Sequence, residues 1–170
     1  IEYMTDMSET HPAITLGMPR YQGQAAFTTS NADETKAKQM LTGKLLAIAY
    51  DDTDKPIAAT HVQTPRILDA LYTSGTMDAD EAELGLLYDG NDIISNLWAP
   101  TAQSVKLNIF DADKVLLTSH EMSLDADTGI WSFSAPNTVD RSFYRFELTL
   151  YHPQNNRFET VHVTDPYSVS

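Results

Sequence analysis

The second half of the sequence is a series of short apolar runs separated by turn-forming residues, at a spacing of about 10 positions. No convincing helix pattern follows Leu86. The turns contain Asp-Ala-Asp, Asp-Thr-Gly, Ala-Pro-Asn and Pro-Gln-Asn-Asn, which favour reversal of an extended chain. Short strands at this spacing indicate a mainly β protein with an antiparallel β-sandwich. The predicted strands are residues 105–111, 115–122, 129–135, 142–153 and 158–166.

The stretch FYRFELTLY, residues 143–151, has the clearest strand pattern. Successive side chains of a strand point to opposite faces of the sheet. The more apolar set is predicted to face the core and consists of Tyr144, Phe146, Leu148 and Leu150. The other set is predicted to face outward and consists of Phe143, Arg145, Glu147, Thr149 and Tyr151.

The first half of the chain differs, because helix-like and strand-like pieces alternate in it. We therefore expect two parts: a partial N-terminal domain or connecting segment of mixed α and β structure at 1–86, and the sandwich at 87–170. The chain begins with Ile1 instead of Met, so we expect it to be a piece of something longer. The elements predicted in the first part are a helix at 30–43, a hairpin at 44–62, a helix at 64–75 and an acidic connection at 76–85.

Residues that favour the ends of helices and strands support the predicted second helix and the predicted hairpin. In the second helix, Thr64 is expected to be the capping residue, Pro65 suits the first position and Gly75 suits the end. In the hairpin, Pro56 is expected to restart the chain at a strand edge, where its missing N–H is tolerated.

The charge of the chain limits its partners. A formal net charge of −13 would repel DNA, RNA and anionic membrane surfaces, and no basic stripe offsets it. No apolar run approaches the ~18–20 residues of a membrane span, so neither nucleic-acid binding nor membrane insertion is expected. An acidic chain remains compatible with a neutral partner such as a sugar. The sequence has no cysteine, which excludes disulfides and thiolate chemistry.

Signatures of catalysis and metal binding are missing from the sequence. It has no Gly-x-Ser-x-Gly, no His-Glu-x-x-His and no Gly-rich phosphate loop, and its five histidines lack metal-ligand spacing. Asp-rich segments at 51–54, 78–80, 111–113 and 125–127 could indicate calcium, but none supplies the full set of ligands of a calcium loop. Because Asp favours tight turns, we interpret these segments as turns and expect no metal and no cofactor.

Aromatic residues suggest a more specific hypothesis. The apolar faces of sugars stack on aromatic rings, so an outward aromatic face of a sheet is a usual platform for glycans. For Trp131 two interpretations remain open, because with Phe133 it could instead alternate inward and fill the core. The candidate glycan-binding residues are Trp131, Arg145, Tyr151, Asn155 and Phe158.

The tripeptide Trp98-Ala99-Pro100 stands at the entry to the strand-rich region. Trp98 could contact a ligand or hold two pieces of protein together. Pro100 removes a backbone donor and should interrupt the strand there. This favours a packing role for Trp98, either against a neighbouring part or over the core.

Several of these stretches together resemble a known family. LWAPTAQSVKLNIFDADK, GIWSFSAP and FYRFELTLYHPQNNRFETVHVTDPYS are similar to the carbohydrate-binding module of family 48, the isoamylase N-terminal type, which precedes the catalytic barrel of type I pullulanases and limit dextrinases. YQGQAAF and GKLLAIAYDDTDKPIAATHVQTPRILDALY resemble the segment before that module. The resemblance covers roughly residues 19–170 and implies an immunoglobulin-like sandwich from about residue 87.

The resemblance also implies a function for the parent enzymes, which belong to glycoside hydrolase family 13 and cleave α-1,6 linkages in pullulan, starch and glycogen. The motifs of the catalytic barrel are missing here, so we expect this fragment to be non-catalytic. Glycogen-binding relatives carry a Trp in the turn that is FDADK here (110–114). Arg145 in YRF matches their Lys, and Phe158 stands near their second Trp. Calcium is possible in such parent enzymes, and an extracellular or cell-surface location is favoured for them.

Two main hypotheses follow, and both remain open. In the first, the chain binds or presents α-glucan and supports the catalytic barrel. In the second, it docks on the barrel of the same polypeptide without glycan affinity. An unrelated protein-binding sandwich and an independent enzyme are further alternatives. The residues expected at an interface with the barrel are Trp98, Pro100, Asp165, Pro166 and Tyr167.

Overall fold

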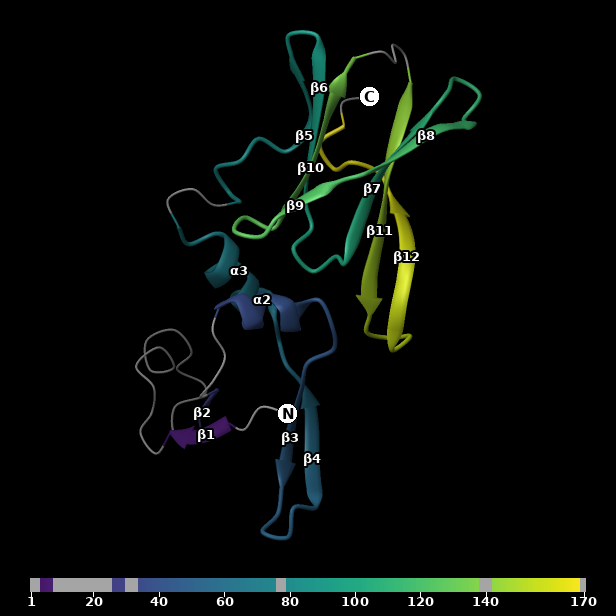
Figure 1. Ribbon diagram of the computed structural model, residues 1–170. Coiled ribbons are helices and arrows are strands. Elements are labelled where there is room, and N and C mark those ends of the chain that lie inside the picture. The colour runs from purple at the N-terminus through teal and green to yellow at the C-terminus, as the bar shows by residue number, and fades with distance from the viewer. Residues whose placement is uncertain (1–3, 8–25, 30–33, 76–78, 138–141, 169–170) are drawn as a thin grey trace. The chain divides into compact units, whose positions relative to one another are not determined.

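The computed structural model describes residues 4–7, 26–29, 34–75, 79–137 and 142–168. The chain divides into two compact units, residues 1–37 and 38–170. In the first unit, strands β1 (Met4–Met7) and β2 (Ala26–Thr29) pair in antiparallel orientation (Figure 1). All other strands, helix α3 and the second half of helix α2 belong to the second unit.

Helix α2 (Glu34–Leu41) lies within the predicted helix at 30–43, of which residues 30–33 fall outside the described residues. Leu41 is its buried residue. After it, the backbone N–H groups of Thr42 and Gly43 donate to carbonyls of the last turn, so the chain leaves the helix in a tight turn.

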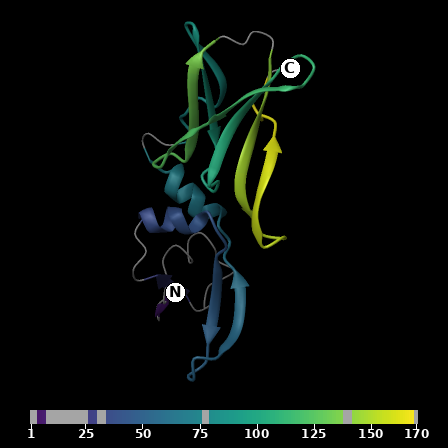
Figure 2. The same ribbon diagram turned by 45° about the vertical axis from the view of Figure 1, so that its right-hand side comes forward.

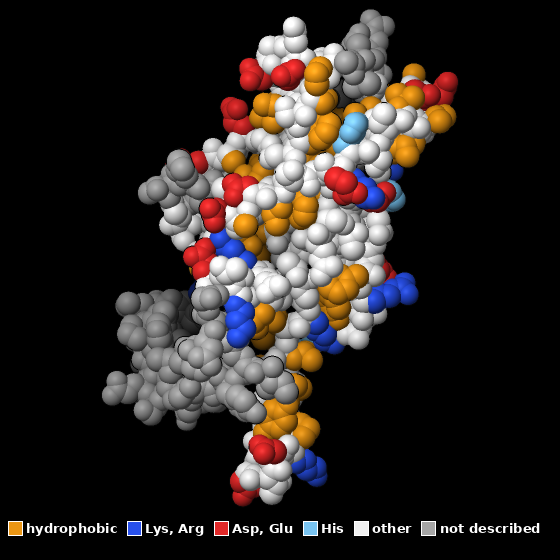
Figure 3. All heavy atoms as spheres, viewed as in Figure 1, with side chains coloured by type: hydrophobic (Ala, Val, Ile, Leu, Met, Phe, Trp, Pro, Cys, Tyr) orange, Lys and Arg blue, Asp and Glu red, His pale blue; other side chains and the backbone are white. Residues whose placement is uncertain are grey.

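The predicted hairpin at 44–62 is confirmed. Strand β3 (Leu46–Tyr50) pairs antiparallel with β4 (Pro56–His61), which begins at Pro56 as expected. The face that carries Leu46, Ile48 and Tyr50 is apolar, yet all three side chains are exposed. Figure 3 shows hydrophobic side chains at the surface of this hairpin. A two-stranded ribbon of this kind has little stability of its own.

Helix α3 (Pro65–Tyr72) confirms the second predicted helix but corrects its ends. Thr64 occupies the N-cap position, yet its side chain makes no capping hydrogen bond, and its backbone is helical with φ −96°. The C-cap is Thr73 instead of Gly75, and its N–H donates to the Asp69 carbonyl. Neither of the described helices, at eight residues each, has the length or apolar character needed to cross a membrane.

Residues 85–163 form two four-stranded antiparallel sheets that face each other (Figures 1 and 2). The first sheet has the order β5-β6-β10-β9 and the second has the order β12-β11-β7-β8. The prediction of a mainly β chain with an antiparallel, immunoglobulin-like sandwich is thus confirmed. The strands are β5 (Gly85–Asp89), β6 (Asp92–Trp98), β7 (Ser104–Phe110), β8 (Leu116–Glu121), β9 (Ser123–Asp125), β10 (Ile130–Pro136), β11 (Phe143–His152) and β12 (Arg157–Val163).

Strands β5 and β6 are absent from the strands predicted above, and β9 is too short to predict. β5 and β6 pair as a hairpin whose turn contains Gly90 at φ +61°. The Asp-Gly at 89–90 is a strong signal for such a turn. Between β8 and β9 the chain passes from one sheet to the other at the buried Met122.

The core lies between the two sheets, and the predicted inward face of β11 is confirmed. Phe146 is fully buried and Leu148 is 7% exposed, while Tyr144 and Leu150 pack at the edge of the same cluster. The buried cluster consists of Leu97, Ala102, Val105, Leu107, Ile109, Met122, Trp131, Phe146 and Leu148.

Candidate functional sites

All four backbone carbonyls of the turn at residues 126–129, between β9 and β10, accept hydrogen bonds from other parts of the chain. Lys38 Nζ donates to the carbonyls of Ala126 and Asp127 at 3.0 and 3.3 Å. Trp98 Nε1 donates to the Thr128 carbonyl at 3.1 Å, and the N–H of Ala99 donates to the Gly129 carbonyl at 3.2 Å. Trp98 therefore connects β6 to this turn, and its predicted place at an interface with the barrel stays a prediction.

Gly129 allows helix α3 to approach the sandwich closely. Its φ is +71°, and a Cβ atom at this position would lie 2.6 Å from Pro100 Cβ and 3.1 Å from the Tyr72 ring. Tyr72 is 4% exposed, and Lys38 Nζ lies 4.8 Å from the centroid of its ring. Pro100 is buried within this chain, so its side chain is not exposed at the interface with the barrel where it was expected.

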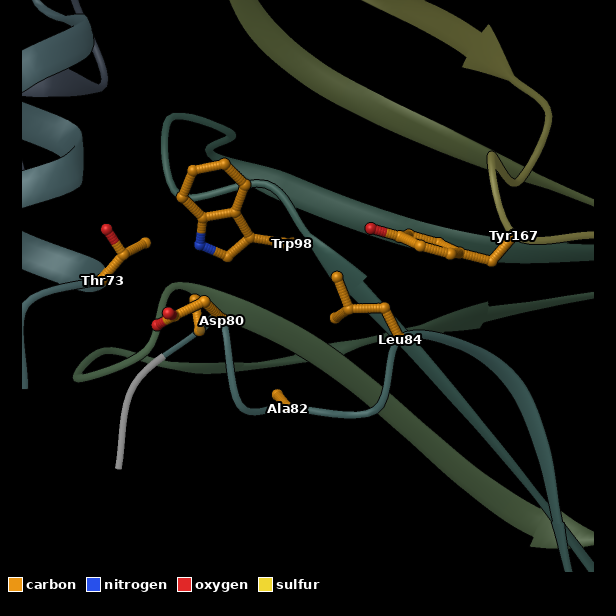
Figure 4. A pocket seen from close by; sticks show the side chains of 7 residues that line it. Thr73, Asp80, Ala82, Leu84, Trp98 and Tyr167 are labelled. Carbon is orange, nitrogen blue, oxygen red and sulfur yellow. The ribbon is translucent and has the colours of Figure 1, made fainter. Parts of the chain in front are cut away.

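A pocket of about 460 Å³ lies beside Trp98, between the end of α3 and the start of β5. Figure 4 shows the indole of Trp98 and the phenol of Tyr167 on adjacent sides, with Leu84 below them. Trp98 is half-buried and Tyr167 is 58% exposed, so both present aromatic surface to solvent. The lining residues are Thr73, Ala79, Asp80, Ala82, Leu84, Trp98 and Tyr167.

Asp165 holds the segment that carries Tyr167. Its carboxylate accepts a 2.5 Å hydrogen bond from the Tyr144 hydroxyl and a 2.8 Å hydrogen bond from the N–H of Tyr167. Burial, together with the bond to this carboxylate, raises the pKa of Tyr144. Asp165 itself is 4% exposed, so its role is to fix the turn, whereas Pro166 and Tyr167 remain on the surface.

A second cluster lies at the hairpin between β11 and β12. The rings of Tyr151 and Phe158 meet edge to face with centroids 5.5 Å apart, and Phe158 is 46% exposed. Asn156 Oδ1 accepts hydrogen bonds from Tyr151 Oη at 2.7 Å and from Lys44 Nζ at 2.6 Å. Three of the predicted glycan-binding residues, Tyr151, Asn155 and Phe158, come together here.

The opposite face of this hairpin is polar. Glu159 accepts hydrogen bonds from Arg157 Nε at 2.7 Å and from Asn155 Nδ2 at 2.8 Å. These two bonds, the one from Arg157 first, lower the pKa of Glu159. Glu159 pairs with Leu150, so its carboxylate lies on the face of the sheet opposite the Tyr151–Phe158 pair. We name residues 151–159 the aromatic hairpin.

The other two predicted glycan-binding residues lie elsewhere. Trp131 is 7% exposed within the core, and its Nε1 donates to the Ala99 carbonyl at 3.0 Å, so the core interpretation is the one that the structure shows. Arg145 is exposed on the outward face of β11, opposite Asn108 of β7. Its position is six residues from Tyr151 along the strand, which corresponds to about 20 Å.

Sequence reasoning missed Lys44 and Asn108. Lys44 is 112 residues from its partner Asn156, and no pattern in the sequence indicates that contact. Asn108 alternates outward in β7 but is only 4% exposed; its Nδ2 donates to Glu147 at 3.3 Å, and its Oδ1 has no partner within the described part of the chain. The alternation of side chains in β7 correctly predicts that Asn108 is on the outward face, but it does not predict that this side chain is buried.

The Asp-rich segments form turns where the structure describes them. Asp51, Asp111 and Asp125 each accept a backbone N–H from two residues ahead, at 2.9 Å in each case. These carboxylates therefore act as turn formers, as interpreted from the sequence. Among residues 34–75, 79–137 and 142–168, no three acidic or histidine side chains are grouped as a metal would require.

Comparison with known proteins agrees with this architecture. Residues 83–168 match carbohydrate-binding module 48 (isoamylase N-terminal domain), and residues 6–70 match the pullulanase N2 domain. A pullulanase of Klebsiella pneumoniae is 34% identical over 157 residues, which is 92% of this chain and 14% of that protein. The chloroplastic pullulanase 1 of Arabidopsis thaliana is 25% identical over 77% of this chain and 13% of its own length.

Solved structures give the same result. The maltotriose complex of Klebsiella pneumoniae pullulanase matches with a TM-score of 0.87 and 32% identity, over 98% of this chain and 15% of that chain. PulA from Klebsiella oxytoca matches with a TM-score of 0.86 and 32% identity, over 98% and 15% of the two chains.

The chain therefore belongs to the carbohydrate-binding module 48 (isoamylase N-terminal domain) family. It has the organisation of the N-terminal region of a type I pullulanase, in which a pullulanase N2 segment precedes that module. It spans about one seventh of the length of the curated Klebsiella relative. The division at 1–86 and 87–170 stays a prediction, and strand β5 (Gly85–Asp89) crosses it.

Proposed function

We propose that this chain is a non-catalytic part of an α-1,6-glucan debranching enzyme and that its aromatic hairpin binds α-glucan. The observation that carries the proposal is the pair Tyr151 and Phe158, because it presents an exposed aromatic surface on a member of a carbohydrate-binding family. Its relatives are pullulanases, and one of them was solved with maltotriose bound.

The chemistry of the hairpin suits a neutral sugar. Phe158 can stack on the apolar face of a glucose ring, and the Asn156 amide beside Tyr151 can exchange hydrogen bonds with hydroxyl groups. A net charge of −13 would not oppose an uncharged glucan.

Calorimetric titration with maltoheptaose tests the proposal. Phe158→Ala should weaken binding about tenfold, which equals about 1.4 kcal/mol of lost aromatic contact. The matched control is Phe143→Ala, because Phe143 is 54% exposed on the same face of β11. It lies eight residues from Tyr151, or about 27 Å along the strand.

The two variants separate a local site from a general effect. Saturable binding that Phe158→Ala weakens and Phe143→Ala leaves intact supports the proposal. Absence of heat at millimolar maltoheptaose, or equal losses in both variants, contradicts it.

We also propose that the pocket beside Trp98 receives part of the catalytic barrel in a polypeptide that carries both. The supporting observation is that Trp98 and Tyr167 line a pocket of about 460 Å³ while Pro166 is exposed next to it. Exposed apolar surface of this kind commonly marks an interface. The exposed apolar face of the β3–β4 hairpin is a second surface that a neighbouring domain could cover.

Thermal unfolding of Tyr167→Ala tests the docking role. In the chain alone, the loss of a side chain that is 58% exposed should change the melting temperature little. In a polypeptide that also contains the barrel, the same variant should lower it by several degrees, because the side chain would then be buried. Equal shifts in the two backgrounds would argue against docking at this pocket.

The chain by itself should release no reducing sugar from pullulan. This follows from the role proposed above, in which the chemistry belongs to the barrel. A reducing-sugar assay on the pure chain decides the matter, and any turnover that survives repeated purification would refute it.

A further inference from the structure

Lys44 connects the start of the β3–β4 hairpin to the aromatic hairpin. Its ammonium group lies 2.6 Å from Asn156 Oδ1, the same oxygen that accepts the Tyr151 hydroxyl at 2.7 Å. Asn156 has φ +53°, a left-handed conformation that Asn tolerates better than most residues. One amide oxygen thus joins a lysine of the first part of the chain to the tyrosine of the candidate glucan site.

Lys38 makes the corresponding connection to the other sheet. It donates to the carbonyls of Ala126 and Asp127, in the turn before β10. The aromatic hairpin belongs to the sheet of β11 and β12, whereas this turn belongs to the sheet of β9 and β10. Residues 38–44, here named the lysine strap, are therefore anchored to one turn of each sheet.

The strap between the two lysines is itself ordered by local contacts. Leu41 is buried, the Thr42 hydroxyl donates to the Gln39 carbonyl at 2.9 Å, and the Gly43 N–H donates to the Met40 carbonyl at 3.2 Å. The segment between the anchors is thus short and held in a turn.

We propose that Lys44 is a positioning residue for α-glucan: the lysine strap holds Asn156 and Tyr151 in place, so that the Tyr151–Phe158 pair is presented to the sugar in a fixed orientation. The identity of the ligand rests on the function proposed above. The positioning itself rests on the contacts of Lys38 and Lys44. An ordered platform loses less conformational freedom when it binds, and binding is correspondingly tighter.

Lys44→Met tests this with two independent measurements. Affinity for maltoheptaose should fall about two- to tenfold, the range expected when one hydrogen bond that orders a site is removed. Hydrogen exchange of backbone amides in residues 151–158 should become faster by a similar factor, because opening of the hairpin is no longer opposed. Lys44→Arg keeps a donor at this position and should restore both properties in large part.

Lys55→Met is the matched control. It removes the same charge from an exposed turn between β3 and β4, so it reproduces the change in net charge without touching the aromatic hairpin. Its affinity and its exchange rates at 151–158 should equal those of the unmodified chain. A Lys44→Met variant that behaves like this control in both measurements would overturn the positioning role.

The results also distinguish this inference from the proposed function. If the unmodified chain binds no maltoheptaose, the glucan site is refuted and Lys44 cannot position that ligand. If the chain binds maltoheptaose and Lys44→Met leaves the affinity unchanged, the positioning role is refuted while glucan binding stands. Faster exchange together with weaker binding, both reversed by Lys44→Arg, supports it.

Discussion

Replacing Gly129 by alanine should destabilise the protein through one close contact. Gly129 has φ +71°, and the added Cβ would lie 2.6 Å from Pro100 Cβ and 3.1 Å from two atoms of the Tyr72 ring. Distances this short require Pro100 or helix α3 to move. The substitution therefore acts on the junction between α3 and the sandwich.

The magnitude follows from three terms. An alanine held in the left-handed region costs about 1–2 kcal/mol, and overpacking costs about 1–3 kcal/mol. Because alanine reduces the conformational entropy of the unfolded chain, about 0.4–1 kcal/mol of this destabilisation is offset. Gly90→Ala is the matched control, because Gly90 has φ +61° but no neighbour within 4 Å of the added Cβ. The two variants should thus differ by the overpacking cost alone, about 1–3 kcal/mol.

Urea denaturation followed by tryptophan fluorescence measures this difference. With a slope of about 2 kcal/mol per molar urea, a difference of about 2 kcal/mol separates the two midpoints by about 1 M. Gly129→Ala should have the lower midpoint. Midpoints that coincide would refute the close approach of Tyr72 and Pro100 to Gly129, and with it the docking of α3 on the sandwich.

Other substitutions have expected outcomes that the same urea titration checks. Ser95 is fully buried and its hydroxyl has no partner among the described residues, so Ser95→Ala should raise the free energy of unfolding by about 1 kcal/mol; a decrease would contradict this. Tyr144→Phe leaves Asp165 with one partner fewer and should lower it by about 1–3 kcal/mol at pH 7. Because the pKa of Tyr144 is raised in the folded state, its contribution is complete below the unfolded pKa of about 10 and is lost as pH rises further; the Phe variant should lack this alkaline loss. Trp98→Phe keeps a ring in the pocket but removes the bond to Thr128, and a cost of about 0.5–1.5 kcal/mol is expected; no change would show that the bond contributes nothing.

The sequence was sufficient to predict the elements whose signal is local. Alternation in β11 identified Phe146 and Leu148 as core residues, and both are buried. The same logic did not predict β5 and β6, although the Asp-Gly turn at 89–90 was visible. A turn dipeptide alone does not indicate which of its flanking runs are long enough to pair.

The candidate sites depend on contacts between residues far apart in the chain, so several of their residues could be predicted from the sequence but most of their contacts could not. Tyr151, Asn155 and Phe158 belong to one hairpin, and their proximity could be expected from the turn between them. Lys38 contacts a turn 88 residues away, and periodicity cannot reveal such a pair. Trp131 remained ambiguous because a tryptophan in an alternating strand can fill a core or meet a ligand, and burial decides between them.

Nuclear magnetic resonance mapping of maltoheptaose on the labelled chain tests the central claim most directly. If the aromatic hairpin is the glucan site, the amide signals that shift should belong to residues 151–159, with Lys44 at the margin and the Trp98 pocket unaffected. The side-chain signal of Trp98 Nε1, which is fixed on Thr128, is a convenient internal reference. Shifts that centre on Trp98 and Tyr167, or no shifts at saturating sugar, would contradict the account.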